Sequence, residues 1–184
     1  MTLLIINLCK HDLHYFEFVK PIEDIAGRMK MKYKAILLKD LKSSDLQRSG
    51  RIIICGTSLQ DFDYLDHDFS WIKNYEKSIL GICAGMQVIC REFGCNLSNA
   101  EDIGLKEAEF HNFLGIDGKR QVYCLHNRIV RHDVAFRKTF DILGDSGYVQ
   151  AAKHKHKDIF TVLFHPEARN KDIIENFLYR SSRD

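Results

Sequence analysis

Short apolar runs that alternate with amphipathic segments constrain the fold of this chain more than any other feature. Four runs rich in isoleucine and leucine lie in its first half, at residues 3–8, 35–38, 51–55 and 79–82. Continuous apolar runs of this length are typical of strands that are buried on both faces of a parallel sheet. Apolar residues at helical spacing separate them, first at Phe18, Ile22, Ile25 and Met29, then at Phe69, Ile72 and Tyr75. This alternation predicts an α/β fold with right-handed crossovers.

The second half of the chain has a different pattern. Residues 121–125, 140–143 and 148–152 are short segments separated by Gly, Asp, Asn and His, which indicates antiparallel strands and hairpins. Residues 158–164 add one more apolar strand, and residues 170–179 have the pattern of an amphipathic helix. We therefore predict an open, mostly parallel central sheet flanked by helices, with an additional antiparallel strand region. Two prolines and no repeat or low-complexity tract predict a single domain over residues 1–184.

Composition excludes several classes of function. Lys and Arg number 27 against 25 Asp and Glu, so the charge gives no case for a nucleic-acid or anionic-membrane partner. The apolar runs are shorter than the roughly 20 residues of a membrane span, and the N-terminus lacks the pattern of a secretion signal. We expect a cytoplasmic protein with a small neutral substrate. The six cysteines form no CxxC pair, so we predict reduced thiols.

One cysteine has neighbours that indicate reactivity. Cys83 stands between Gly81 and Gly85, where an apolar run passes into an amphipathic segment at residues 84–93. A tight turn from strand to helix strains the residue at its apex, and small neighbours relieve the crowding. The thiol then lies at the carboxyl end of a strand, where open α/β sheets bind ligands, and at a helix N-terminus that favours the thiolate. We predict that Cys83 is a nucleophile.

A thiolate that cleaves an amide also needs a proton shuttle and donors for the oxyanion. His165 follows the late apolar strand, and Glu167, two residues on, would point the same way from an extended strand end and orient the imidazole. These residues predict a Cys-His-Glu triad. For the oxyanion we predict the backbone N–H of Ala84, next to the nucleophile, and that of Gly56, which also ends a predicted parallel strand.

The segments GICAGMQ around Cys83 and VLFHPEA around His165 resemble the triad (class I) glutamine amidotransferases, and the resemblance covers nearly the whole chain. It implies the flavodoxin-like fold of that family. The segments VQAAKHKHKDIFTVLFHPE and LHNRIV are similar to the glutaminase subunit of GMP synthase and the glutaminase component of anthranilate synthase. GICAGMQ is also similar to the glutaminase of imidazole glycerol phosphate synthase, which the later segments fit less well.

The resemblance implies roles for individual residues. Cys83 would attack the side-chain amide of glutamine to form a thioester and release ammonia, with His165 as general base and acid and Glu167 as its orienter. Gln87 matches a family glutamine that holds the substrate. Asn127 and Arg128 occupy a segment through which relatives contact the substrate, although relatives have Ser-Leu or Gly-Asp there. The loop CGTSLQD also differs from the family's Gly-Gly-Pro or Gly-Ser-Pro run at Gly56.

The resemblance also implies a partner, an ATP-dependent synthetase that consumes the ammonia and is most similar to GMP synthase. The chain itself shows no P-loop or other nucleotide motif, and we predict no cofactor. Two alternatives stay open: a stand-alone γ-glutamyl hydrolase or peptidase, and a non-catalytic regulatory subunit of the same fold.

Two histidine patterns raise the question of whether the chain binds a metal ion. KHKHK at residues 153–157 carries His154 and His156, and His11 and His14 have helical spacing. Alternating Lys and His is more typical of a solvated hairpin, and neither pattern has further ligands nearby in the sequence. We therefore predict no metal site.

Overall fold

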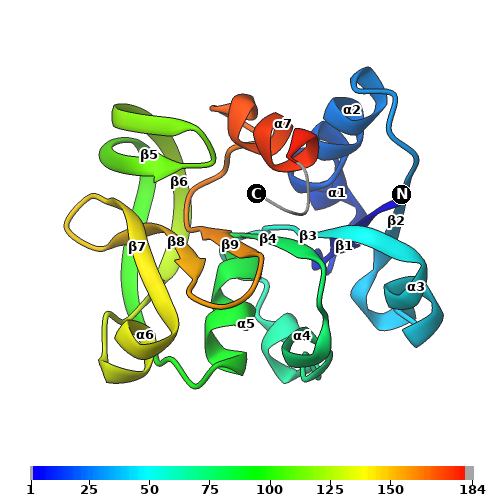
Figure 1. The fold of residues 1–184 in the computed structure, drawn as a ribbon, viewed down its shortest axis with the longest axis horizontal. Helices are drawn as coiled ribbons and strands as arrows, with labels where there is room; N and C mark the ends of the chain where they lie inside the picture. Colours follow the sequence, from blue (N-terminus) through cyan, green and yellow to red (C-terminus); the bar gives the residue numbers. More distant parts are fainter. Residues whose placement is uncertain (1, 181–184) are drawn as a thin grey trace.

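The computed structural model describes residues 2–180, which form one nine-stranded sheet with helices on both faces (Figure 1). The strands are β1 (Thr2–Asn7), β2 (Tyr33–Leu37), β3 (Ser49–Ile54), β4 (Ser78–Ile82), β5 (Leu97–Phe113), β6 (Ile116–Val130), β7 (Phe140–Asp145), β8 (Val149–His154) and β9 (Ile159–Val162). The helices are α1 (Asp12–Phe18), α2 (Lys20–Arg28), α3 (Ser43–Arg48), α4 (Trp71–Asn74), α5 (Ala84–Glu92), α6 (Val134–Thr139) and α7 (Lys171–Tyr179). Two 3₁₀ turns, η1 (Leu38–Asp40) and η2 (Asp63–Asp66), follow β2 and precede α4.

The parallel part of the sheet has the order β2-β1-β3-β4-β9. The first four of these strands are the apolar runs predicted from the sequence, so the α/β prediction with a flavodoxin-like order is confirmed. In such a sheet the carboxyl ends of β3, β4 and β9 lie at one edge. Cys83 directly follows β4 and His165 follows β9, which brings segments far apart in the sequence to the same edge.

The remaining strands extend the sheet in antiparallel fashion, in the order β8-β7-β5-β6. Figure 1 shows the long β5–β6 hairpin curving away from the parallel strands. We predicted antiparallel strands in this half but not β5. Its sequence carries many charges, and its apolar residues Ile103 and Leu105 are exposed, so no continuous buried face marks it as a strand.

Two clusters of buried side chains lie on the two faces of the sheet. On one face, Leu3, Ile5, Ile53 and Leu80 pack against helices α1, α2 and α7; on the other, Leu4, Ile6, Ile52 and Ile54 pack against α4 and α5. The alternation within each strand means that both faces are apolar, as the continuous runs predicted. Figure 1 shows these helices on opposite sides of the sheet.

Some local predictions were wrong. The helical spacing at Phe69, Ile72 and Tyr75 corresponds to only one turn, α4, between loops.

The KHKHK segment, which we predicted to be a solvated hairpin, does join β8 to β9. However, His154 is buried and accepts hydrogen bonds from the backbone N–H groups of His156 and Lys157 at 3.0 and 3.1 Å. The imidazole therefore stabilises the turn of the hairpin from its buried side.

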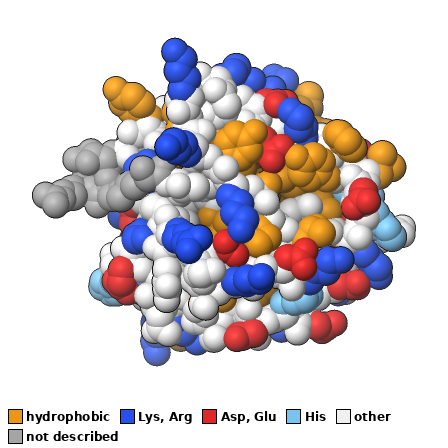
Figure 2. All heavy atoms as spheres, turned by 90° about the vertical axis from the view of Figure 1, so that its right-hand side faces the viewer, with side chains coloured by type: hydrophobic (Ala, Val, Ile, Leu, Met, Phe, Trp, Pro, Cys, Tyr) orange, Lys and Arg blue, Asp and Glu red, His pale blue; other side chains and the backbone are white. Residues whose placement is uncertain are grey.

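Three further features bear on the interpretation of the composition: the surface charges, the cysteines and the lengths of the helices. On the face around β2 and α3, Lys and Arg side chains are interspersed with Asp and Glu, without a continuous basic area (Figure 2). All six cysteines are buried free thiols. Within residues 2–180, every helix falls short of the length and apolar character that crossing a membrane requires.

Candidate active site

Cys83 occupies a strained backbone position at the junction of β4 and α5. Its φ is 49° and its ψ is −102°, a conformation that costs a non-glycine residue about 1–3 kcal/mol. Two hydrogen bonds hold it: the Cys83 N–H donates to the Val162 carbonyl oxygen at 2.8 Å, and the Gln87 N–H donates to the Cys83 carbonyl oxygen at 3.1 Å. The predicted elbow is present, with the thiol at the start of a helix.

Glycines on both sides of Cys83 let α5 pack directly on the sheet. A Cβ atom on Gly85 would lie 2.2 Å from the Ile54 carbonyl oxygen, and one on Gly81 would lie 2.5 Å from Ile89 Cδ1 and 2.7 Å from the Gly85 carbonyl carbon. These distances are shorter than side-chain contacts allow. The two glycines are therefore required by close packing of strand and helix.

His165 and Glu167 form a buried pair beside β9. Glu167 Oε1 lies 2.7 Å from His165 Nδ1, and each residue is only 2% exposed. The pairing was predicted, but its cause was not: the chain turns after β9, with the N–H groups of Ala168 and Arg169 donating to the His165 carbonyl oxygen at 3.2 Å. A turn rather than an extended strand end brings the carboxylate back to the ring.

The thiol and the imidazole meet at one carbonyl group. Cys83 Sγ lies 3.7 Å from the Leu125 carbonyl oxygen, and His165 Nε2 lies 3.3 Å from the same oxygen. Gly56 is beside both: a Cβ there would lie 2.6 Å from His165 Cε1 and 3.4 Å from Cys83 Cβ. The ends of β3, β4 and β9 thus converge as predicted.

The environment of His165 favours its charged form. Burial lowers the pKa of the imidazole, but the Glu167 carboxylate and the Cys83 sulfur outweigh burial and raise the pKa well above its ordinary value. These interactions therefore favour the imidazolium form, whose Nδ1 lies next to Glu167. That form can pair with a thiolate and give up a proton from Nε2.

Two backbone donors are available near the sulfur. Among residues 2–180, neither the Gly56 N–H nor the Ala84 N–H donates a backbone hydrogen bond. Ala84 is the first residue of α5, where helix N–H groups have no partner within the helix. Both residues flank Cys83 in space.

Gln87 lies one helical turn beyond the nucleophile and is buried. Its Oε1 accepts a hydrogen bond from the Tyr64 hydroxyl at 2.6 Å, and its Nε2 donates to the Arg128 carbonyl oxygen at 3.3 Å. The side chain is thus held in one orientation along the wall of the cavity in front of Cys83. Tyr64 was not among the residues that we expected here.

The segment after His126 covers this cavity. Asn127 Nδ2 donates to the Leu59 carbonyl oxygen at 2.8 Å, and the Arg128 guanidinium lies 4.3 Å from the centre of the Phe62 ring. The cavity beneath has a volume of ≈ 10 Å³. That is about the space of one water molecule, so a glutamine side chain would enter only if these contacts open.

Sequence reasoning missed Asp61, which anchors the loop that begins at Gly56. Asp61 Oδ2 accepts hydrogen bonds from Thr57 Oγ1 at 2.7 Å and the Lys10 N–H at 3.2 Å, and it lies 3.1 Å from His14 Nδ1. His14, considered above for metal binding, has this structural contact instead. No local pattern marks Asp61, because two of its partners are far away in the sequence: His14 is 47 positions distant and Lys10 is 51.

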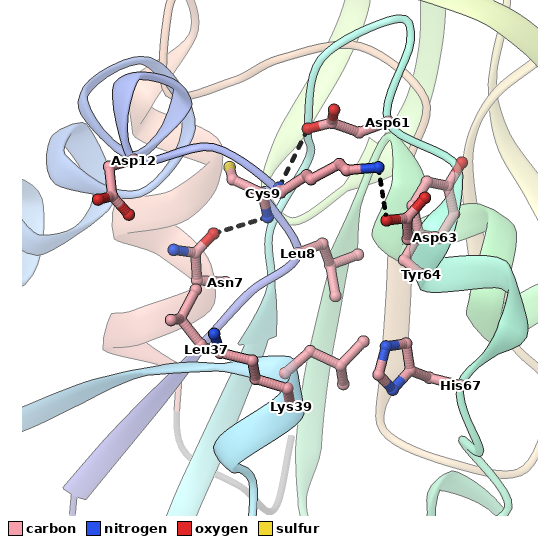
Figure 3. Close-up of a pocket in the computed structure, with 12 residues that line it drawn as sticks. Asn7, Leu8, Cys9, Asp12, Leu37, Lys39, Asp61, Asp63, Tyr64 and His67 are labelled. Carbon is pink, nitrogen blue, oxygen red and sulfur yellow. Dashed lines mark hydrogen bonds and ion pairs between the residues drawn. The ribbon is translucent and has the colours of Figure 1, made fainter.

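A larger cavity of ≈ 280 Å³ lies next to this loop, at the carboxyl ends of β1 and β2 (Figure 3). Asp61 and Tyr64 line both this cavity and the one in front of Cys83. On the opposite side from Tyr64, the Asn7 side chain accepts a hydrogen bond from the Cys9 N–H at 2.8 Å. Lys10 forms an ion pair at 2.9 Å with Asp63, which lies beside Tyr64. Cys83 and His165 do not line the larger cavity.

Solved structures share this fold. A Thermoplasma acidophilum protein described as part of a GMP synthase superposes with a TM-score of 0.82 at 21% identity, over 97% of this chain and 92% of that one. A glutamine amidotransferase from Thermotoga maritima gives a TM-score of 0.72 at 18% identity, over 98% and 86% of the two chains. The α/β architecture described above is therefore that of glutamine amidotransferase structures.

Relatives found by sequence indicate the same family as the solved structures. A protein from Haemophilus influenzae named for anthranilate synthase component II is 30% identical over 191 residues, covering 97% of this chain and 94% of that protein. A glutamine-hydrolysing GMP synthase subunit of Methanobrevibacter smithii is 33% identical over 119 residues, which span 58% of this chain and only 61% of the relative. Residues 16–181 match the family described as glutamine amidotransferase class-I. The chain therefore belongs to the class-I glutamine amidotransferases.

Proposed function

We propose that this chain hydrolyses the side-chain amide of glutamine through a thioester on Cys83. The observation that carries the proposal is the convergence of a strained cysteine, a buried imidazole and a buried carboxylate at one edge of the sheet. Family membership supports glutamine as the substrate, and the geometry supports a separate role for each of the three groups.

The chemistry needs only these groups and water. The Cys83 thiolate attacks the amide carbon, and a C–S bond forms as the carbonyl π electrons move to oxygen. The His165 imidazolium gives its Nε2 proton to the amide nitrogen, the C–N bond breaks and ammonia leaves. His165 then takes a proton from water, the resulting hydroxide attacks the thioester carbon, and the C–S bond breaks to release glutamate and the thiolate. Glu167 holds Nδ1 in both steps.

Backbone and side-chain groups around Cys83 would complete the site. The N–H groups of Gly56 and Ala84, which donate no backbone hydrogen bond among the described residues, would hold the oxyanion of both tetrahedral intermediates. Gln87, Asn127 and Arg128 would hold the glutamine, after the contacts of Asn127 with Leu59 and of Arg128 with Phe62 have opened.

We further propose that residues 1–184 act as one glutaminase domain that delivers ammonia to an ATP-dependent synthetase similar to GMP synthase. Support comes from relatives named as GMP synthase subunits and as component II of anthranilate synthase. Residues 1–184 carry no P-loop, which agrees with activation of the ammonia acceptor outside these residues.

The decisive experiment compares Cys83→Ala with a matched cysteine variant. Cys95→Ala removes another buried thiol three residues beyond the end of α5. We expect Cys83→Ala to abolish glutamine hydrolysis, while the complex with its synthetase still uses free ammonium, and Cys95→Ala to retain both reactions. Trapping of a glutamyl adduct on Cys83 by mass spectrometry after acid quenching would identify the thioester.

Other outcomes would contradict the proposal. Glutamine hydrolysis that survives Cys83→Ala would reject the nucleophile. Turnover of γ-glutamyl conjugates in preference to glutamine, without a partner, would favour a stand-alone γ-glutamyl hydrolase. Failure of Cys83 to react with a glutamine-like electrophile, alone and with the synthetase, would indicate a non-catalytic regulatory subunit.

A further inference from the structure

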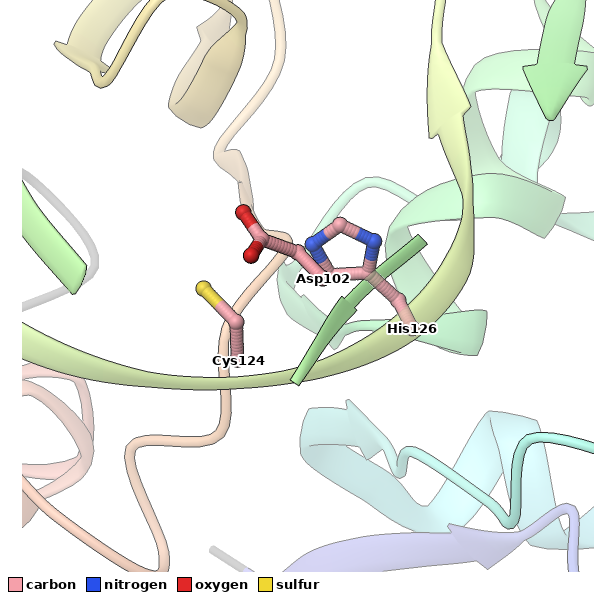
Figure 4. Close-up of side chains that lie close together, drawn as sticks. All are labelled: Asp102, Cys124 and His126. Carbon is pink, nitrogen blue, oxygen red and sulfur yellow. The ribbon is translucent and has the colours of Figure 1, made fainter. Parts of the chain in front are cut away.

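Three side chains that ligate metals meet on one face of the β5–β6 hairpin. The ligating atoms of Asp102, Cys124 and His126 all lie within 4.8 Å of one another (Figure 4). The ladder of the hairpin explains why: Asp102 stands directly opposite His126, and Cys124 precedes His126 by two positions on β6. Residues two apart on a strand and the residue opposite share one face, so the register places all three together.

The imidazole of His126 has an unused nitrogen at this place. His126 is 2% exposed, and its Nδ1 lies 3.4 Å from the Ala100 carbonyl oxygen. Its Nε2 is buried without a hydrogen-bond partner among the described residues. In Figure 4 one ring nitrogen of His126 is on the side that faces Asp102 and Cys124. A buried nitrogen without a partner is costly, and a ligand would remove that cost.

We infer that Asp102, Cys124 and His126 bind a single Zn²⁺ ion. Thiolate, imidazole and carboxylate together are the donor set that zinc prefers. Zinc bonds to these donors are about 2.0–2.3 Å long, so binding requires the three atoms to approach one another by roughly 1 Å. Gln150 Oε1 lies 4.0 Å from Cys124 Sγ and offers an oxygen atom as a fourth ligand.

The charges around the cluster set the conditions for binding. Zinc is bound by the thiolate form of a cysteine, so binding at Cys124 displaces the thiol proton. The Asp102 carboxylate forms an ion pair with Lys106 at 2.7 Å and accepts a hydrogen bond from the Tyr148 hydroxyl. Each carboxylate oxygen still has a second lone pair for a metal. Lys106 is half-exposed and can move away, which opens the cluster towards solvent.

The location connects the zinc site to the nucleophile. Leu125 lies between the two ligands on β6, and its carbonyl oxygen is the group that both Cys83 and His165 contact. His126 also lines the cavity in front of Cys83. A metal bound here would fix the strand segment that borders the reacting sulfur.

Cys83 and His165 are themselves a thiol and an imidazole, so the test removes the nucleophile first. Full-length Cys83→Ala protein with reduced thiols is titrated with Zn²⁺ by calorimetry, and with Co²⁺ to record the thiolate-to-cobalt charge-transfer band. We expect one ion per chain, about one proton released, and the charge-transfer band. Loss of an outer partner already costs a metal site about 10- to 100-fold in affinity, so adding Cys124→Ser should cost at least that much.

Matched variants in the same background make the result specific. Cys95→Ser, which removes a buried thiol outside the cluster, should leave zinc binding unchanged. Asp102→Asn should weaken zinc binding while retaining the charge-transfer band, which keeps the test decisive if Cys124→Ser fails to fold. Lys106→Met removes the competing cation and should tighten zinc binding severalfold.

Several results would overturn the inference. Zinc binding that disappears in Cys83→Ala alone would place the metal on the nucleophile and His165. Unchanged binding in a folded Cys124→Ser variant would place it elsewhere, for example on the histidines of the β8–β9 hairpin. Unchanged or weaker binding in Lys106→Met would remove Asp102 from the ligand set, and no binding at micromolar Zn²⁺ would reject the site.

Discussion

Glu167 Oε1 lies 2.7 Å from His165 Nδ1, and both side chains are excluded from solvent. The carboxylate both orients the ring and keeps a proton on it, because without a nearby negative charge burial would favour the neutral imidazole. The other oxygen of the carboxylate, Oε2, is buried without a partner among the described residues. The pairing with His165 is therefore the main polar contact that holds the carboxylate there.

Glu167→Gln tests this relationship with little change in shape. The amide cannot stabilise the imidazolium, so the pKa of His165 should fall and general acid catalysis should weaken. We expect kcat for glutamine to drop by about 10²- to 10⁴-fold. Glu175→Gln, which alters an exposed carboxylate paired with Arg28 on the surface, is the matched control and should keep normal kcat. Equal rates in the two variants would show that Glu167 does not act on His165.

The same pair predicts how stability depends on pH. The folded-state pKa of His165 is raised above its ordinary value of 6.5, so its contribution to stability is fully present below about pH 6.5. That contribution is lost as the pH rises from 6.5 through the folded-state pKa. Urea unfolding across this range should show a decline in the free energy of unfolding for the wild-type protein that is smaller in Glu167→Gln. An identical decline in both proteins would assign it to another group.

Asp61→Asn tests the anchor of the loop that begins at Gly56. The change keeps the side-chain shape but weakens the bonds from Thr57 and Lys10, and hydrogen bonds to charged groups contribute about 1.5–3 kcal/mol each. We expect a loss of that order in the free energy of unfolding and a lower kcat, since the Gly56 N–H would lose its fixed position. Asp63→Asn, which removes only an exposed ion pair with Lys10, should change neither quantity. Matching effects in both variants would mean that Asp61 does not position the loop.

Tyr64→Phe tests whether Gln87 needs to be held for substrate binding. The change removes the hydroxyl that donates to Gln87 Oε1 at 2.6 Å but retains the buried ring. One hydrogen bond of this kind contributes about 0.5–1.5 kcal/mol, so KM for glutamine should rise by about two- to tenfold with kcat little changed. Tyr75→Phe also removes a buried hydroxyl contact, with Ser49 at the opposite end of the sheet, and should leave KM unaltered. A normal KM in Tyr64→Phe would argue against Gln87 as a substrate contact.

The difference between what the sequence predicted and what it missed follows from the range of the interactions. Cys83 and its two glycines form a local turn, and Glu167 is two residues from His165, so short patterns are enough to predict both. Asp61 acts through bonds to residues 47 and 51 positions away, which no local pattern reveals. The cluster of Asp102, Cys124 and His126 depends on the register of a hairpin whose first strand was not predicted at all. Tyr64 was missed because a buried tyrosine in a loop is indistinguishable in sequence from one used for packing.

Gly85→Ala tests whether the elbow depends on direct contact between α5 and the sheet. The added methyl group would lie 2.2 Å from the Ile54 carbonyl oxygen, so α5 would have to move away from β3 and carry Cys83 with it. Overpacking of this kind costs about 1–3 kcal/mol, and we expect a loss of stability of at least this size together with loss of glutaminase activity. Gly27→Ala is the matched control: a methyl group there meets no atom within 4 Å, and in helix α2 it should stabilise the protein by about 0.4–1 kcal/mol. Chemical unfolding and glutamine turnover of the two variants measure both effects, and a stable, active Gly85→Ala protein would show that the elbow tolerates a wider separation of helix and sheet.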